Sequence, residues 1–98
     1  GDITTDPDPV IINGLTHVTV NFNITGFTEL VSQEWVLDPF ARTLTITVYA
    51  RERADIQGAW DGKVTVPVTF LDLGVWRIIV PQEGGQEATV DIYVHPET

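Results

Sequence analysis

The residue types that could do chemistry are few in this chain, and their spacing forms no known catalytic arrangement. Ser32 is the only serine, and it lacks the Gly-x-Ser-x-Gly context that presents a nucleophile on a sharp turn. The two histidines, His17 and His95, stand near opposite ends of the sequence. The chain has 14 acidic residues, but nothing in their order singles out a pair for acid–base work. We therefore expect no enzyme activity.

Cysteine and methionine are both absent from the chain. Thiol catalysis, thiolate metal sites and disulfides are therefore excluded. The histidines lack His-x-x-x-His spacing, and the Gly84-Gly85 pair lacks the lysine and the following Ser or Thr of a phosphate-binding loop. We expect neither a bound transition metal nor an organic cofactor.

Calcium is a more open question because its ligands are oxygens. Asp2, Asp6 and Asp8 lie in one proline-containing segment, and Asp61 could join them from a later loop. Calcium takes about six to eight oxygen ligands, and its common loops follow an Asp-x-Asp-x-Asp-Gly pattern that this chain lacks. The alternative is a solvated acidic segment, and both interpretations stay open at this point.

The formal net charge of the chain is −9, from 14 acidic and five basic residues. A field of this sign repels the phosphates of nucleic acids and the surfaces of anionic membranes. We therefore expect neither as a partner. Like charge also opposes self-association, so we expect a monomer.

Basic residues concentrate in the middle of the chain, where four of the five lie between positions 42 and 63. Tyrosine, tryptophan and arginine occur together there, and these types are enriched at protein-binding hot spots. The sequence therefore predicts a binding surface formed by Tyr49, Arg51, Arg53 and Trp60. The alternative is that Trp60 folds over the end of the domain while the arginines pair with Glu52 and Asp55.

Short segments with alternating apolar residues run through the whole chain, separated by turn residues about every ten positions. Period two with β-branched and aromatic residues is typical of half-buried strands. We predict an all-β fold, an immunoglobulin-like antiparallel two-sheet sandwich of about seven strands. Residues 1–9 are predicted to be an extended linker, and 10–98 to be a single domain. The predicted strands cover residues 10–12, 17–25, 29–38, 41–53, 63–70, 75–80 and 87–95.

Four features refine this prediction. Proline cannot donate to a strand ladder, so Pro67 places its strand at a sheet edge or beside a bulge. The Gly84-Gly85 pair predicts a hairpin turn. Trp35 and Trp76 lie on the apolar sides of their segments, and we predict that both are buried in the core.

Residues 72–78 read Asp-Leu-Gly-Val-Trp-Arg-Ile. This segment resembles the Asp-x-Gly-x-Tyr-x-Cys signature of immunoglobulin domains, with Trp76 in place of the tyrosine and Ile78 in place of the cysteine. The resemblance implies that Trp76 is the aromatic residue at the turn into the penultimate strand.

A second resemblance spans residues 18–94. Residues 26–30 read Gly-Phe-Thr-Glu-Leu, residues 51–55 read Arg-Glu-Arg-Ala-Asp, and residues 71–76 read Leu-Asp-Leu-Gly-Val-Trp. In this order and spacing they resemble small secreted immunoglobulin-like domains of bacterial lipoproteins, which have no established activity. The resemblance implies a secreted or cell-envelope location, with lipid anchoring left open. Since the chain begins at Gly1, we expect a leader or anchor to have been removed.

The chain departs from that group at its usual cysteine pair. Phe27 occupies the first cysteine position, and residues 58–60 lack the second. The resemblance therefore implies that the cross-link is lost, and we expect burial of Phe27 to substitute for it in part.

Together these features lead us to expect a non-catalytic extracellular or envelope module, either a spacer or a protein-binding domain. Its partner would be an unidentified protein or glycan of the cell envelope. One alternative is a carbohydrate-binding module that uses exposed aromatic residues such as Tyr49, Trp60 and Tyr93. Another is an inhibitor that offers the loop at residues 54–62 to a secreted hydrolase.

Overall fold

A computed structural model describes residues 3–22, 28–52 and 60–97 of the chain. In these residues the structure is all β and contains eight strands. None of the described residues forms a helix long and apolar enough to cross a bilayer. The strands are β1 (Ile3–Asp6), β2 (Val10–Ile11), β3 (Leu15–Asn21), β4 (Thr28–Asp38), β5 (Thr43–Glu52), β6 (Lys63–Thr69), β7 (Gly74–Pro81) and β8 (Glu87–His95).

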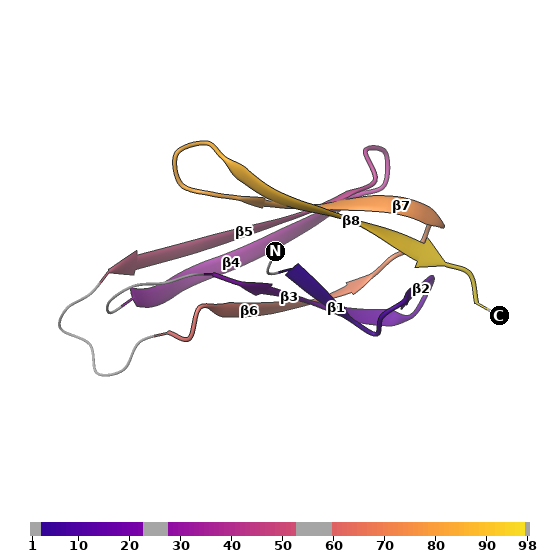
Figure 1. The fold of residues 1–98 in the computed structure, drawn as a ribbon, viewed down its shortest axis with the longest axis horizontal. Coiled ribbons are helices and arrows are strands. Elements are labelled where there is room, and N and C mark those ends of the chain that lie inside the picture. The colour runs from indigo at the N-terminus through magenta and orange to yellow at the C-terminus, as the bar shows by residue number, and fades with distance from the viewer. Residues whose placement is uncertain (1–2, 23–27, 53–59, 98) are drawn as a thin grey trace.

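The strands form two sheets that face each other as a sandwich (Figure 1). One sheet has three strands in the order β1-β3-β6, and the other has five in the order β2-β8-β7-β5-β4. Every strand predicted from the sequence corresponds to one of the strands β2 to β8. The molecule measures 51 × 25 × 20 Å, with its long axis close to the strand direction in Figure 1.

The prediction that all strands pair antiparallel is wrong at two places. β2 runs parallel to β8, and β5 runs parallel to β7 through the pairs Thr43↔Arg77, Leu44↔Ile78 and Thr45↔Ile79. Parallel neighbours need a crossover between them. Here β6 supplies it, because it lies between β5 and β7 in sequence but belongs to the opposite sheet.

The segment at residues 1–9, expected to be a linker, contributes a strand to the sandwich. Ile3–Asp6 form β1, which pairs antiparallel with β3 from Ile3↔Val20 to Asp6↔His17. The side chain of Ile3 packs against the core. The two prolines of the segment led to the prediction of a linker. They do not prevent strand pairing, because both follow β1 in the sequence.

The core lies between the two sheets and follows the predicted alternation. β6 shows it most clearly, since Val64, Val66 and Val68 are buried while every other side chain in the strand is exposed. Burial of apolar side chains is the main favourable term in folding. The fully buried residues with the largest side chains are Trp76, Phe70, Leu44, Ile46 and Ile78.

Trp76 combines packing with a specific hydrogen bond, and its predicted core position is confirmed. The side chain is 1% exposed, and its ring meets the ring of Phe70 edge-on with centroids 5.2 Å apart. The indole Nε1 donates to the backbone oxygen of Asp72 at 3.0 Å. This bond fixes the turn that leads into β7, because a buried polar group without a partner is costly.

Trp35, in contrast, does not lie in the core, so that prediction is wrong. It lies opposite the buried Ile46 and therefore takes the core-facing side of β4, yet it is 39% exposed. The reason is that β4 is the edge strand of the five-stranded sheet, and no side chain from β4 is a member of the buried apolar core. A side chain on the core-facing side of a strand is buried only if a strand of the opposite sheet covers it.

Other local predictions are confirmed. β6, which contains Pro67, pairs only with β3 among the described strands and is an edge strand. The Gly84-Gly85 pair adopts positive φ at both residues and turns the β7–β8 hairpin, closed by a 2.7 Å hydrogen bond from the Gln82 N–H to the Gln86 carbonyl. Glycine is favoured there because positive φ is costly for other residues.

The different burial of the two tryptophans predicts different effects on stability. Trp76→Ala should lower the free energy of unfolding by about 3–5 kcal/mol, because it leaves a core cavity. Trp35→Ala should cost only about 1–2 kcal/mol, since much of its area is already in water. Urea denaturation followed by circular dichroism measures both values, and equal losses would contradict the assignment of Trp35 to an uncovered edge.

Candidate functional site

The candidate site lies on the side of the five-stranded sheet that faces away from the core. We call the solvent-facing side chains of β5, β7 and β8 the outer face. Cross-strand pairing places Val75 beside Tyr93 and Arg77 beside Asp91 on it. Val75 is 56% exposed and Tyr93 is 53% exposed. Exposed apolar and aromatic side chains that lie next to each other commonly mark an interaction surface.

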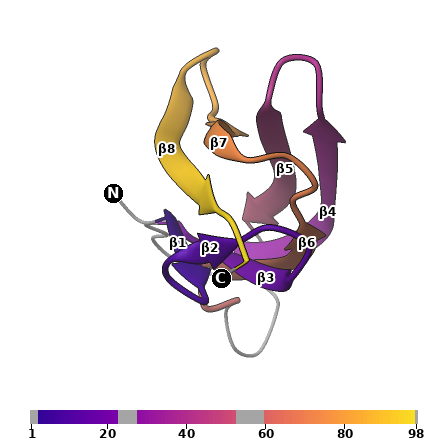
Figure 2. The same ribbon diagram turned by 90° about the vertical axis from the view of Figure 1, so that its right-hand side faces the viewer.

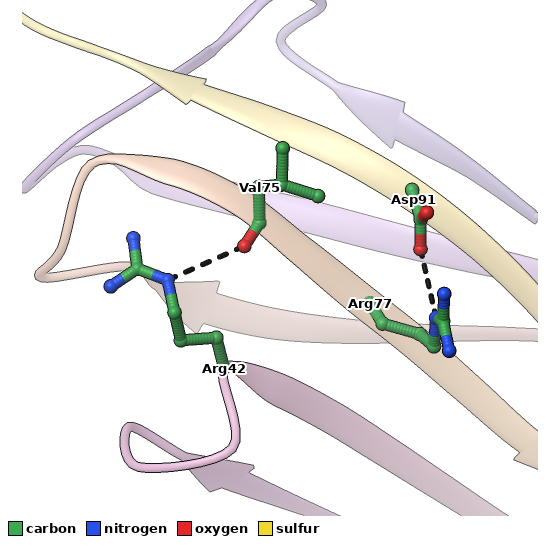
Figure 3. Close-up of polar contacts among 4 residues, drawn as sticks. All are labelled: Arg42, Val75, Arg77 and Asp91. Carbon is green, nitrogen blue, oxygen red and sulfur yellow. Dashed lines mark hydrogen bonds and ion pairs between the residues drawn. The ribbon is translucent and has the colours of Figure 1, made fainter.

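Where the β4–β5 turn meets β7, the outer face has a shallow hollow of about 240 Å³. Two arginines line it, Arg42 from the turn and Arg77 from β7 (Figure 3). The carboxylate of Asp91 from β8 lines the same hollow. Two cationic side chains and one anionic side chain therefore line the hollow, which gives it a net positive charge. The chain as a whole has a formal net charge of −9.

Arg42 is held in place by three contacts. Its Nε donates to the Val75 carbonyl at 3.4 Å, and its guanidinium carbon lies 5.6 Å from the centre of the Trp76 ring. The backbone N–H of Arg77 donates to the Arg42 carbonyl at 2.9 Å. A cation over an indole face is attracted by the ring quadrupole, so the buried tryptophan orients a charged group at the surface.

Arg42 and Gly74 accommodate each other. Arg42 adopts a φ of 56°, and Gly74 adopts a φ of 104°. A Cβ at Gly74 would come within 3.0 Å of the Arg42 guanidinium. Both the backbone conformation and the space therefore require glycine at this position.

Arg77 and Asp91 form an ion pair across β7 and β8, with Nε and Oδ1 3.0 Å apart. The hydrogen bond from Arg77 lowers the pKa of Asp91 from its ordinary value of 3.8; partial desolvation opposes the change and the charge of Arg77 adds to it. The same hydrogen bond raises the pKa of Arg77. Because both side chains are exposed, the pair contributes little to stability, but it holds the guanidinium of Arg77 beside Asp91.

Two of the four residues predicted to form a binding surface do lie on the outer face. Tyr49 is 53% exposed on β5, and Arg51 lies two residues further along the same side. The Nε of Arg51 meets the carboxylate of Glu29 on β4 at 3.0 Å. Asp55, which the alternative named as a partner of the arginines together with Glu52, lies outside the described residues.

Trp60, the third of the four predicted residues, does not join them on the outer face. Trp60 is only partly exposed and packs against the core, with its ring 5.8 Å from that of Phe22. Its Nε1 donates to the Lys63 carbonyl at 3.1 Å. The alternative in which Trp60 folds over the domain end describes it correctly. Arg53 and most of the loop at residues 54–62 lie outside the described residues, as does Phe27.

The sequence contained a signal for the residues that the predicted protein-binding surface left out, of which Tyr93 was named only for the carbohydrate-binding alternative. Val75 and Tyr93 are apolar or aromatic at positions where the alternation of their strands points to solvent. Arg77 and Asp91 share that parity. Only the pairing register shows that these four residues are neighbours, and a single sequence does not give the register between β7 and β8.

The chemistry-bearing residues of the described ranges stay apart. His17 lies on β3 and His95 on β8, in different sheets, and Ser32 lies on β4. Within residues 3–22, 28–52 and 60–97, no three His, Asp or Glu side chains gather in a way that could hold a metal ion. Asp6 and Asp8 are both exposed, while Asp2 lies outside the described residues.

Comparisons with protein-family models, with curated proteins and with solved structures gave no match to this chain. The functional argument therefore depends on the residues of the chain itself.

The contact between Gly74 and Arg42 predicts a stability difference between two glycines. Gly84→Ala should cost about 1–3 kcal/mol through its positive φ alone, because its Cβ would meet nothing within 4 Å. Gly74→Ala should cost more, since the same strain is joined by a collision with Arg42. Urea unfolding measures the additional loss of stability of Gly74→Ala over Gly84→Ala. This additional loss should become smaller when Arg42 is also replaced by alanine, and an unchanged value would contradict the contact.

The Arg77–Asp91 pair predicts that the pKa of Asp91 depends on Arg77. Because the folded-state pKa of Asp91 is lowered, its contribution to stability is present above the unfolded pKa and is lost as the pH falls through the folded pKa. Arg77→Gln should raise the pKa of Asp91 toward 3.8. The carboxyl carbon shift of Asp91 in an NMR pH titration reports this. Arg51→Gln, the control, should leave Asp91 unchanged, and the pair is refuted if Arg77→Gln also leaves it unchanged.

Proposed function

We propose that this chain is a non-catalytic protein-binding module of a bacterial secreted or cell-envelope protein, and that it binds its partner through the outer face. The observation that carries the proposal is the exposed pair Val75 and Tyr93 beside the arginine-lined hollow. Tyrosine and arginine are enriched at interface hot spots, and apolar residues around them exclude water on binding.

The hollow adds a polar anchor to this surface. Arg42 and Arg77 approach it from two different elements, and each guanidinium has further N–H groups beyond the one used in the contacts above. A carboxylate from a partner protein can accept a hydrogen bond from either of them. Charge of this kind fixes the orientation of a complex more than it adds to affinity.

The backbone of the outer face is rigid enough to present these groups without rearrangement. β7 is bonded to β8 over eight residue pairs from Gly74↔Val94 to Pro81↔Glu87, and its other side chains fill the core. Sites built on strands keep their geometry better than sites on loops, so less conformational entropy is lost on binding. A spacer role needs no such surface, and we therefore favour binding.

Carbohydrate binding is less well supported by the same residues. Tyr49 and Tyr93 are exposed, but they lie on β5 and β8 with β7 between them. Trp60 is turned against Phe22 and holds the Lys63 carbonyl. A sugar platform needs aromatic rings that lie together, and these three do not.

An immunoglobulin-related origin is part of the proposal. Two observations support it: the first strands, β1 and β2, join opposite sheets, and an aromatic residue at the start of β7 bonds back to the chain at Asp72. The second is the role that a tyrosine has in immunoglobulin domains. The order β7-β5-β4 is a departure from the immunoglobulin arrangement. In that arrangement the strand that follows β3 in sequence, here β4, would be the neighbour of β7, whereas in this structure β5 takes that place. The secreted location follows from the resemblance to domains of bacterial lipoproteins.

The test is affinity capture from an envelope extract of the source organism with three forms of the domain as bait. The double variant Val75→Thr with Tyr93→Thr keeps β-forming residues but removes the apolar area, and should weaken capture about tenfold or more. The control Leu15→Thr changes a residue that is 59% exposed on the three-stranded sheet and should capture as the original does.

Binding of the captured protein is then measured with purified components by biolayer interferometry. Equal binding by all three forms would refute the assignment of the outer face. Capture of no protein above background by any form would support a spacer instead. A response to cell-wall glycans that is lost with Tyr93→Thr would move the assignment to carbohydrate binding.

A further inference from the structure

The four edge strands of the two sheets are protected to different degrees. An edge strand exposes unpaired backbone groups that can bind another chain, and proteins protect such edges with short strands, prolines or lysines. β1 has four residues and β2 has two. β6 begins at Lys63 and carries Pro67 in its middle. Residues 90–93 of β8, which β2 does not cover, face β1 across a groove of about 360 Å³.

β4, the remaining edge, has no such protection along most of its length. It is 11 residues long and contains no proline, lysine or arginine. A bulge between Leu30 and Ser32 interrupts its first part. From Ser32↔Tyr49 to Asp38↔Thr43 it pairs regularly with β5 on one side. No strand among the described residues pairs with its other side.

β4 differs from β6, the other long edge strand, in how far its side chains are buried. β6 alternates between buried and exposed residues along its whole length, whereas β4 is exposed at every residue from Val31 to Val36. Both surfaces of the strand are therefore open around Trp35, which is 39% exposed, and Val36, which is 65% exposed. In Figure 2, β4 forms one outer side of the molecule, with β5 between it and β7.

We propose that residues 32–38 of β4 form a docking edge, at which an extended, basic segment of a partner protein adds as a sixth strand of the sheet. Strand addition draws its affinity from main-chain hydrogen bonds and its specificity from side chains at alternate positions. An antiparallel addition fits best, because parallel pairing is slightly less stable per residue.

The side chains of the docking edge define the partner. On the outward side, Glu34, Val36 and Asp38 alternate acid, apolar and acid. Their neighbours across β5 are uncharged threonines, Thr47, Thr45 and Thr43. Opposite charges and β-branched pairs on facing strands are favourable. The incoming strand should therefore carry lysine or arginine, then an apolar residue, then lysine or arginine at alternate positions.

The core-facing side of the docking edge adds a second requirement. Trp35 and Leu37 lie there, and an aromatic or β-branched residue opposite Trp35 would cover the part of the indole that the three-stranded sheet leaves exposed. Aromatic cross-strand pairs of this kind stabilise a sheet.

A second copy of this chain is not the occupant that the charges favour. Two docking edges would bring together two sets of Glu34 and Asp38, and each chain carries a net charge of −9. Like charges on paired strands are unfavourable. A basic segment neutralises the same carboxylates. The docking edge is also separate from Val75 and Tyr93 on β7 and β8, so its test is independent of the outer face.

The test uses an extended peptide of about nine residues, a typical strand length. Its centre is lysine, tyrosine, valine, threonine, lysine, flanked by threonines. Titrated into the isotope-labelled domain, it should shift the backbone amide NMR signals of residues 32–38 and leave those of β6 unchanged. Glu34→Lys should weaken binding about tenfold or more through charge reversal.

Glu83→Lys is the matched control, because it makes the same charge change at an exposed residue of the β7–β8 turn and should bind as the original chain does. A peptide methylated on the backbone nitrogens that face β4 should lose binding, because strand addition needs those N–H groups. Amide spectra of both variants without peptide establish that they are folded.

Four results would overturn the proposal. The first is no shift at millimolar peptide. The second is an equal loss with Glu83→Lys, which indicates general charge attraction. The third is undiminished binding of the methylated peptide, which indicates a side-chain contact only. The fourth is a dimer of the domain alone that Glu34→Lys dissociates, which would make a second copy the occupant.

Discussion

The packing of a five-stranded sheet against a three-stranded one is the constraint on which the rest of the structure depends. Apolar side chains are stabilised only where the opposite layer covers them, and three strands cannot cover five. In the five-stranded sheet, the buried core side chains accordingly come from β2, β5, β7 and β8, whereas β4 contributes only the partly buried Leu30 and Leu37. The exposure of Trp35 and the poor coverage of β4 follow from this difference in sheet size.

Trp76 connects the core to the surface on the opposite side of the same sheet. Its ring fills the interior beside Phe70, its N–H fixes the turn at Asp72, and its face holds the guanidinium of Arg42. A single residue thus sets both the geometry of a turn and the position of a surface charge. Figure 3 shows the result, with Arg42 directed at the Val75 carbonyl of β7 and Arg77 directed at Asp91 of β8.

Much of the fold could be predicted from the sequence, because strands with one buried face must alternate. The alternation located β2 to β8, and Pro67 identified β6 as an edge strand. Sheet order could not be predicted in the same way. Trp35 alternates like a core residue, and its exposure depends on whether β4 or β5 is the neighbour of β7.

The candidate site was predicted less well for a related reason. Parity along one strand correctly placed Tyr49 and Arg51 toward solvent. Parity says nothing about a loop residue, and Trp60 turned inward because its indole could reach both Phe22 and the Lys63 carbonyl. The candidate site combines the outer face of three strands with Arg42 of a turn, and such neighbours are identified only when the register between strands is known.

The short parallel contact between β5 and β7 has a consequence for the order of folding. The β4–β5 and β7–β8 hairpins are local in sequence, and hairpins form within about 1–10 μs. The hairpins meet through three residue pairs and the contact of Arg42 with Val75, which lie 33 positions apart. Closing a loop of that length carries an entropic cost that must be met before the new contacts compensate for it. We therefore expect the two hairpins to form faster than the seam that joins them.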